Sequence, residues 1–397
     1  MQTLVTPTRG LVAQAAVVLV ALGLIGVAAW CDPAWLYRHA LPEYFNPRSE
    51  QLVILMRARI ALVIVALVLA VFVRPRFGRM MQGKTWGRFA LDVAPSLVAV
   101  VLAIGASEVI LERISWRATH QAPADREPRR QWDHTLGWVN VPNRAGRQAL
   151  GGRMVSYAFD ADGRRVARLG DQVDPTRPTI LFVGESIVNG HGLDWPETIP
   201  ARVQADTGVQ VADLAVGGYA TDQEYLRLKA ALPAFRQPRA VVILFLPSLI
   251  HRVLDTDRPH LDRGLVLKAP EVGLRLRQTL RRATPLHRPS TIARGLDITA
   301  ETLKASVDLA RARGAVPLIL VPQMTPDTAE EAALRRRLLD DQGLPYIHVV
   351  VDPAFHLPHN RHPDPRGAAV ISRAVSAYLR AHGVAPDVNP APPAASP

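Results

Sequence analysis

Cysteine is almost absent from this chain, since Cys31 is the only one among 397 residues. An internal disulfide framework is therefore excluded, and an oxidising compartment is neither required nor excluded. Acidic residues are also scarce, with 35 Asp and Glu against 47 Lys and Arg, which gives a formal net charge of +12. This imbalance favours contact with something anionic, such as lipid headgroups, an acidic glycan or nucleic acid.

Long apolar runs are concentrated in the first 112 residues. Three of them reach the length of about 20 residues that a helix needs to cross roughly 30 Å of hydrocarbon. Unbroken apolar runs of this length are rare in soluble proteins, so membrane spans are favoured over buried core helices. The predicted transmembrane helices are 11–30, 52–73 and 91–111, within an anchor of residues 1–112.

Two other interpretations of the first apolar run are disfavoured. A cleaved signal peptide would have a shorter apolar core, and two further spans follow this one. Lipid attachment at Cys31 requires a small residue directly before the cysteine, and Trp30 is not small. An uncleaved first helix is therefore expected.

Basic residues between the predicted spans set the expected orientation, because Lys and Arg favour the cytoplasmic side. Residues 31–51 hold two basic and three acidic residues, whereas residues 74–90 hold no acidic residue. We therefore expect the second loop and the N-terminus to be cytoplasmic, and everything after residue 112 to be periplasmic. The basic residues of the second loop are Arg74, Arg76, Arg79, Lys84 and Arg88.

Beyond residue 112, short β-rich segments alternate with helical ones from residue 178 to about 384. Five strands that are each followed by a helix predict an open parallel sheet with helices on both faces. The expected strands are 179–183, 209–214, 241–246, 316–321 and 346–351. The expected helices are 196–206, 222–232, 302–313, 328–341 and 365–382.

Three segments fall outside this alternation. Residues 113–177 are predicted to be a connector with a small β region, and the Pro/Ala-rich residues 385–397 a disordered tail. Residues 252–296 form a strongly basic insertion, which is either a solvated helix face or a patch facing anionic lipid headgroups or an acidic glycan. Nucleic acid is not expected as a partner of a domain outside the inner membrane.

Polar residues after the strands are the candidates for chemistry, because ligands bind at the carboxyl ends of parallel strands. Ser186 follows the first strand, and alone it would be no more than a turn serine. His362 follows the last strand, just before Asp364 and Pro365, which suit the start of the final helix. A serine and a histidine on one sheet edge are what Ser–His acyl chemistry needs.

Several segments resemble the SGNH (GDSL-like) hydrolases. Residues 182–190 (FVGESIVNG) look like the first block of that family, with Glu185 where aspartate is commoner. Residues 214–222 (LAVGGYATD) are similar to the second block, and His362-Pro363 to the fifth. The lead-in resembles membrane-tethered bacterial members at Ser107-Glu108, Leu136-Gly137-Trp138, Pro142-Asn143 and Asp162-Gly163. The resemblance covers about 108–382.

This resemblance implies a flavodoxin-like three-layer fold with an open, parallel five-stranded sheet, placed behind three transmembrane helices. It also implies that Ser186 is the nucleophile and, through its own N–H, an oxyanion donor. Gly218 would be the second oxyanion donor and His362 the general base.

Two positions depart from the family pattern. The loop after the third strand has no asparagine, so either Ser248 is the third oxyanion donor or the hole has only two. No acidic residue precedes His362 at the expected spacing, and Asn360 is the residue there that could orient the imidazole.

The other histidines near these blocks have competing interpretations. His191 is either a polar loop residue or a substrate contact or substitute base. His356, His359 and His362 share one loop, but no carboxylate or cysteine stands at ligand spacing. No metal and no other cofactor is therefore expected.

The expected function is that of a membrane-anchored SGNH-type serine esterase in the bacterial inner membrane. Its substrate would be an acyl ester, in the first instance an O-acetyl ester, of a cell-envelope glycan or lipid. An O-acyltransferase that uses the same serine, with a sugar hydroxyl as acceptor, is the adjacent alternative. A third alternative is a catalytically degenerate domain that binds an acylated glycan or a membrane partner without turnover.

Overall fold

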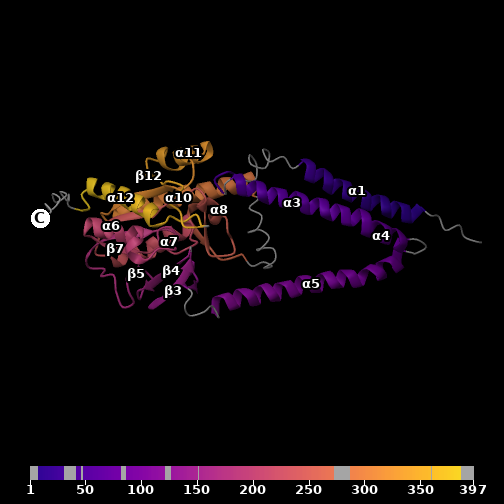
Figure 1. The fold of residues 1–397 in the computed structure, drawn as a ribbon, viewed down its shortest axis with the longest axis horizontal. Helices are drawn as coiled ribbons and strands as arrows, with labels where there is room; N and C mark the ends of the chain where they lie inside the picture. Colours follow the sequence, from indigo (N-terminus) through magenta and orange to yellow (C-terminus); the bar gives the residue numbers. More distant parts are fainter. Residues whose placement is uncertain are drawn as a thin grey trace, which may run out of the picture. The chain divides into compact units, whose positions relative to one another are not determined.

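The computed structural model describes residues 8–30, 42–45, 48–81, 86–120, 127–150, 152–271, 287–358 and 360–385 (Figure 1). The chain divides into two compact units, of which the first comprises residues 1–115 and 273–289. The second unit comprises residues 116–272 and 290–397. The predicted tail lies almost entirely outside the described residues, as does the middle of the basic segment.

The first unit is helical. Its helix α1 packs against α3 and α4, and a π-helical turn at Leu69–Val73 joins α3 to α4. At Gly78 the helices approach so closely that a Cβ atom there would overlap the side chain of Gln14. The helices are α1 (Thr8–Trp30), α3 (Arg48–Val68), α4 (Arg74–Met81) and α5 (Trp86–His120), of which α5 continues into the second unit.

The helices of the first unit bury small residues and expose large apolar ones, whereas a soluble helical bundle buries its large apolar residues. Small residues are buried, with Ala21 and Ala66 only 3% and 1% exposed. Large apolar residues point outward, and Leu19 is 69% exposed. Helices that pack through small residues and turn large apolar ones outward suit apolar surroundings. Two helical segments, Gly10–Trp30 and Leu55–Met80, are long and apolar enough to cross a membrane.

These two segments overlap the predicted spans 11–30 and 52–73. The expectation that the second span ends in a loop at residue 74 is wrong, because the helix runs on through α4. Arg74, Arg76 and Arg79 therefore lie on a helix. The third predicted span, 91–111, lies within α5 but is not among the two segments above, so it stays a prediction. The orientation also stays a prediction.

The second unit is built on an eight-stranded sheet with the order β12-β11-β8-β6-β7-β5-β4-β3 (Figure 1). Its first five strands in this order run parallel, as the strand–helix alternation predicts. In the register of the central strands, Phe182 pairs with Asp213 on one side and with Val242 on the other. The parallel strands are β6 (Pro178–Val183), β7 (Gln210–Asp213), β8 (Gln237–Leu244), β11 (Val316–Gln323) and β12 (Tyr346–Val350).

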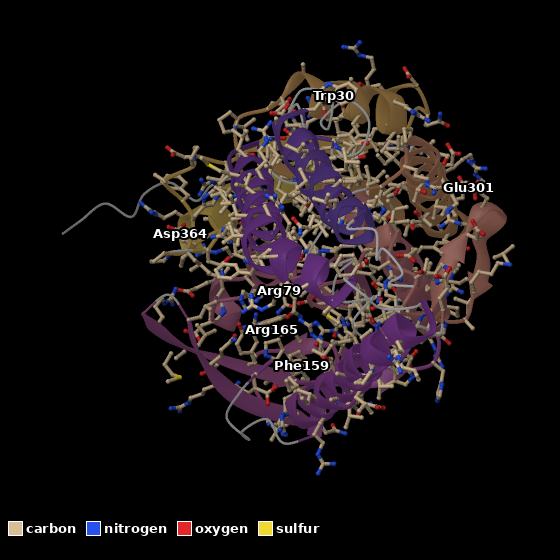
Figure 2. The ribbon with its side chains drawn as sticks, turned by 90° about the vertical axis from the view of Figure 1, so that its right-hand side faces the viewer. Trp30, Arg79, Phe159, Arg165, Glu301 and Asp364 are labelled. Carbon is tan, nitrogen blue, oxygen red and sulfur yellow. The ribbon has the colours of Figure 1, made fainter. Side chains whose placement is uncertain are left out.

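The predicted total of five strands is wrong, because three antiparallel strands extend the sheet beyond β7. They come from residues 113–177, the segment expected to be a connector with a small β region, which proves to be part of the main sheet. A parallel strand at an edge leaves backbone groups unpaired, and β5 occupies this edge by pairing Arg165 with Asp213. Phe159 and Arg165 are register partners in the β4–β5 ladder (Figure 2). The added strands are β3 (Arg144–Leu150), β4 (Arg153–Phe159) and β5 (Arg165–Val166).

Helices cover the parallel strands in two groups. Helices α6 (Ile199–Thr207) and α12 (Pro365–Ala381) pack together in one buried cluster with alternate strand residues such as Ile180 and Phe182 (Figure 1). A second cluster contains residues of α7 and α10. The remaining helices are α7 (Thr221–Ala231), α8 (Leu249–Val253), α10 (Pro289–Ala312) and α11 (Ala329–Arg335).

The described part of the basic segment 252–296 consists mainly of a β-hairpin and the start of a helix. It contains a hairpin of β9 (His260–Asp262) and β10 (Val266–Lys268), and it ends in the first turns of α10. The helix expected at 302–313 begins at Pro289, because Thr and Ser occupy buried positions of α10 and their hydroxyls bond to carbonyls one turn back. Arg258 is not on a basic surface, since it is 3% exposed and pairs with Asp222.

Strand β6 marks the place where the winding of the sheet reverses. Its neighbours are β7 on one side and β8 on the other, so successive connections leave in opposite directions. In open α/β sheets, ligands bind in the crevice that forms at the carboxyl ends of strands beside such a reversal.

Candidate active site

Ser186 lies in a tight turn directly after β6. Gly184 begins this turn, and it has no space for a side chain, because a Cβ atom would lie 2.8 Å from Val188 Cγ2 and 3.0 Å from Leu244 Cβ. The carbonyl of Ser186 accepts a hydrogen bond from the His191 N–H at 2.9 Å, which closes the loop. The turn therefore holds the half-buried serine at the carboxyl end of the sheet.

His362 lies in the loop between β12 and α12, and backbone hydrogen bonds hold this loop at both ends. The Leu357 N–H donates to the His362 carbonyl, and the Asp364 N–H donates to the Phe355 carbonyl, both at 2.9 Å. The Asp364 carboxylate then accepts two N–H groups from the first turn of α12, and Pro365 occupies the first helical position. This is the helix start that the sequence predicts.

The structure brings Ser186, His362 and Asn360 together. The Oγ atom of Ser186 lies 2.6 Å from Nε2 of His362. On the other side of the ring, Nδ1 of His362 is in hydrogen-bond contact with Oδ1 of Asn360, which also accepts the His362 backbone N–H at 3.1 Å. An amide oxygen can only accept, so Nδ1 carries the proton and Nε2 is free to accept one from the serine.

Glu185 supplies a negative charge beside this pair. Its side chain is 2% exposed, contacts the Ser186 hydroxyl, and accepts hydrogen bonds from the Ile187 N–H at 2.8 Å and from Arg252 at 3.2 Å. Burial raises the pKa of Glu185, but Arg252, the serine hydroxyl, His362 and the Ile187 N–H together outweigh burial and lower it. The carboxylate is therefore ionised at neutral pH and faces the imidazole.

Both imidazoles of the site are neutral at pH 7. Burial lowers the pKa of His362 from its usual 6.5, Glu185 opposes this shift, and Arg252 and His356 add to it. The ring of His191 lies 4.7 Å from that of His362, centroid to centroid. Burial, followed by His362, lowers the pKa of His191 to about 4. Among the described residues no hydrogen bond joins the His191 ring to another group, so its nitrogens can face a ligand.

The turn at Gly217-Gly218 lies beside the serine. Gly218 has a φ of +83°, a conformation that suits glycine, and a Cβ atom on Gly217 would lie 3.7 Å from Ser186 Cβ. Ser248 is half-buried in the turn after β8, and no hydrogen bond within the described part of the chain joins it to Ser186 or His362. The oxyanion roles of Gly218 and Ser248 stay predictions.

Sequence reasoning missed three charged residues of the site. In the sequence, Glu185 stands out only as a substitution in a motif, and Arg252 falls within the basic segment 252–296. Arg130 was missed altogether, although it lies on β1 (Arg130–Asp133), which pairs with β2 (Gly137–Asn140). The one available signal was the Leu136-Gly137-Trp138 segment, because Trp138 holds this hairpin to the Gly217 turn.

The histidine-rich loop does not form a metal centre within the described residues, where no three His, Cys, Asp or Glu side chains are grouped to hold an ion. His359, one of the three histidines considered, lies outside those residues.

Comparison with known proteins adds a set of distant structural likenesses. No protein-family model matches the chain, and no curated protein does. Several similar solved structures are GDSL-like or SGNH hydrolases. The chain is 14% identical to a GDSL-like lipase from Bacteroides thetaiotaomicron, with 51% of this chain and 88% of that one covered and a TM-score of 0.33.

Two further solved structures are similar over about half of this chain. A member of the lipolytic G-D-S-L family from Veillonella parvula is 14% identical, with 51% of this chain and 96% of that one covered and a TM-score of 0.32. An acetyl xylan esterase from Butyrivibrio proteoclasticus is 12% identical, with 54% of this chain and 67% of that one covered and a TM-score of 0.33.

Proposed function

We propose that the chain is a membrane-anchored serine esterase that cleaves an acyl ester of a cell-envelope glycan or lipid. The observation that carries the proposal is the 2.6 Å contact between Ser186 Oγ and Nε2 of His362, with Asn360 fixing the opposite ring nitrogen. A neutral imidazole in this position can take the proton of a serine hydroxyl as it attacks an ester carbonyl.

In the proposed reaction, Ser186 Oγ attacks the carbonyl carbon while its proton passes to Nε2 of His362. The alkoxide leaves with that proton as an alcohol, and an acyl group stays on the serine. Water then attacks the acyl carbon and gives a proton to the same nitrogen. The bond between Ser186 Oγ and the acyl carbon breaks, Nε2 returns the proton to Oγ, and a carboxylic acid is released. Gly218 and the Ser186 N–H are the proposed donors to the oxyanion, a role worth about 3–4 kcal/mol per donor.

The membrane part of the proposal rests on the first unit. Its helices bury alanines and expose large apolar side chains, and two segments have the length of a membrane span. The proposed location is the inner membrane of a bacterium, with the α/β unit in the periplasm.

A fluorophosphonate probe tests the chemistry and the orientation together. A membrane-impermeant fluorophosphonate added to spheroplasts that express the full chain should label it on Ser186, and Ser186→Ala should abolish the label. Because the active serine would face outward, lysis should not increase labelling. Mass spectrometry of the labelled peptide identifies the residue.

The outcomes of this experiment separate the hypotheses. Labelling of Ser186 only after lysis would support the esterase activity but would contradict the proposed orientation, because the serine would then face the cytoplasm. No labelling of a correctly folded chain would contradict the esterase and favour a binding module. Ser290→Ala, which changes an exposed serine in the first turn of α10, is the matched control and should label normally.

Asn360→Asp should raise kcat for p-nitrophenyl acetate by about tenfold, which corresponds to roughly 1.4 kcal/mol of extra stabilisation of the imidazolium. The carboxylate would keep the contact with Nδ1 and add a negative charge to it. It should also raise the pKa seen in the acid limb of the pH–rate profile. Steady-state rates from pH 4 to 9 measure both, and an unchanged or lower kcat would show that Asn360 does not orient the base.

A further inference from the structure

The β1–β2 hairpin is fastened over the glycine turn next to Ser186. The indole N–H of Trp138 donates to the Gly217 carbonyl at 3.2 Å, and the Tyr219 hydroxyl donates to the Trp138 carbonyl at 2.7 Å. The Gln223 side chain donates to the Leu136 carbonyl at 2.6 Å. Two of these hydrogen bonds fix the hairpin against the turn, and the third fixes it against the start of α7.

This docking places the guanidinium of Arg130 over the turn. A Cβ atom on Gly217 would lie 2.9 Å from Arg130 Nη2 and 3.7 Å from Ser186 Cβ, so the arginine and the serine flank the same backbone atom. A Cβ atom on Gly218 would lie 3.4 Å from Arg130 Nη1. The guanidinium also lies 6.0 Å from the centre of the Trp138 ring, within the range of a cation–π contact.

Arg130 differs from the other arginines around the site in having no acceptor among the residues that the structure describes. Arg252 bonds to Glu185 and to the Tyr219 carbonyl, and Arg258 bonds to both oxygens of Asp222. Within the described residues, the guanidinium of Arg130 makes neither a hydrogen bond nor an ion pair, while the residue as a whole is exposed. Burial of the guanidinium beside the glycine turn lowers its pKa, so its donors are partly removed from water without a protein acceptor in the described chain.

The charges around Arg130 do not offer an internal partner. Glu185 is the carboxylate whose charge acts on it, but that carboxylate is already bonded to Arg252, Ser186 and the Ile187 N–H. The two imidazoles are neutral. The rim of the site therefore presents an unneutralised positive charge.

We propose that Arg130 binds an anionic group, a carboxylate or a phosphate, on the substrate close to the ester that Ser186 attacks. A guanidinium presents paired N–H donors that match the two oxygens of either group. The substrate class is then an acyl ester of an acidic molecule, whether an acidic glycan or an anionic lipid. This inference rests on the proposed function and narrows it.

Matched acetate esters test the proposal on the full chain in a non-ionic detergent. The probes are 4-acetoxybenzoate, its neutral isostere 4-acetoxybenzamide, and 4-acetoxyphenyl phosphate. Arg130→Gln should lower kcat/KM for at least one anionic ester by about 10- to 100-fold relative to the amide, because a charge-assisted hydrogen bond is lost. Arg130→Lys should recover part of this preference, since it keeps the charge.

The anionic arms distinguish the two groups: a preference confined to the benzoate indicates a carboxylate on the substrate, and one confined to the phosphate ester indicates a phosphate. Arg373→Gln, on the exposed face of α12, removes the same charge elsewhere and should leave the ratios unchanged. If Arg130→Gln lowered kcat/KM equally for all three esters, or for none, the anion-binding role would be overturned and the proposed esterase activity would remain. No hydrolysis of any ester by the wild-type chain would overturn both.

Discussion

His362→Gln should lower kcat for p-nitrophenyl acetate by about 10³- to 10⁴-fold, with little change in KM. Glutamine fills similar space and can still donate to Ser186, but it cannot take a proton from it. The serine hydroxyl would then have to attack without a base. Steady-state hydrolysis by the detergent-solubilised chain measures the loss.

The pH profile adds a second test of the same residue. Burial lowers the pKa of His362 from 6.5 despite the opposing charge of Glu185, and only the neutral ring can act as a base. For the wild-type chain, kcat should therefore rise with pH around a midpoint below 6.5, and this rise should be absent from His362→Gln.

A second histidine of the chain provides the control for this substitution. His382→Gln, at the far end of α12 where the ring stacks on Tyr378, should keep wild-type activity. If His362→Gln kept activity within about tenfold of wild type, the proton would pass to another group. Glu185, which contacts the same hydroxyl, would then be the first residue to test.

Arg165→Leu should lower the free energy of unfolding of the α/β unit by about 3–5 kcal/mol. Arg165 is fully buried, and its guanidinium donates to the carbonyls of Ser156, Asn189, Gly190 and Leu193 (Figure 2). It also lies 4.2 Å from the centre of the Tyr157 ring. Three of the four carbonyls belong to the loop that follows Ser186.

Two effects of this substitution oppose each other. Removing a buried charge recovers part of its desolvation cost, which is why some buried ion pairs can be replaced by apolar residues at no loss. Here the partners are backbone carbonyls that no substitution can remove, and an unsatisfied buried acceptor costs about 1–3 kcal/mol. Because four carbonyl acceptors lose their donor, the cost of leaving them unsatisfied should exceed the desolvation free energy that is recovered, and the substitution should destabilise the α/β unit.

Pulse proteolysis in increasing urea measures the unfolding of the α/β unit in the full chain. Arg177→Leu, which removes an exposed arginine just before β6, should change the unfolding free energy by less than about 0.5 kcal/mol. Arg165→Lys should fall between the two, because an ammonium reaches fewer carbonyls. An unchanged urea midpoint for Arg165→Leu would show that the loop does not depend on this arginine.

Sequence pattern predicted the parallel part of the fold because each strand carries its own signal. The five strands are short apolar runs followed by helices, and β6 at Pro178–Val183 matches the expected 179–183 closely. The proximity of Ser186 and His362 followed from the same pattern, since parallel strands bring their carboxyl ends to one edge.

The remaining features depend on contacts between distant segments. The strands β3 to β5 join the sheet only because the edge of β7 accepts them, and no local pattern states which edge a strand will pair with. Arg130 reaches the site because Trp138 bonds to Gly217, so its role depends on how a hairpin docks. Glu185 and Arg252 form an ion pair between the turn after β6 and helix α8, and no local sequence pattern states that these two segments meet.

The antiparallel strands also decide where the α/β unit can be cut. Strand β5 covers the edge of β7, and β3 carries arginines at the outer margin of the sheet, Arg144 and Arg147. A fragment that began at residue 178 would lose this cover and present the unpaired backbone groups of β7 to other copies, which is a template for aggregation. A soluble fragment should therefore begin before β1, at about residue 127, where the hairpin and all eight strands are retained.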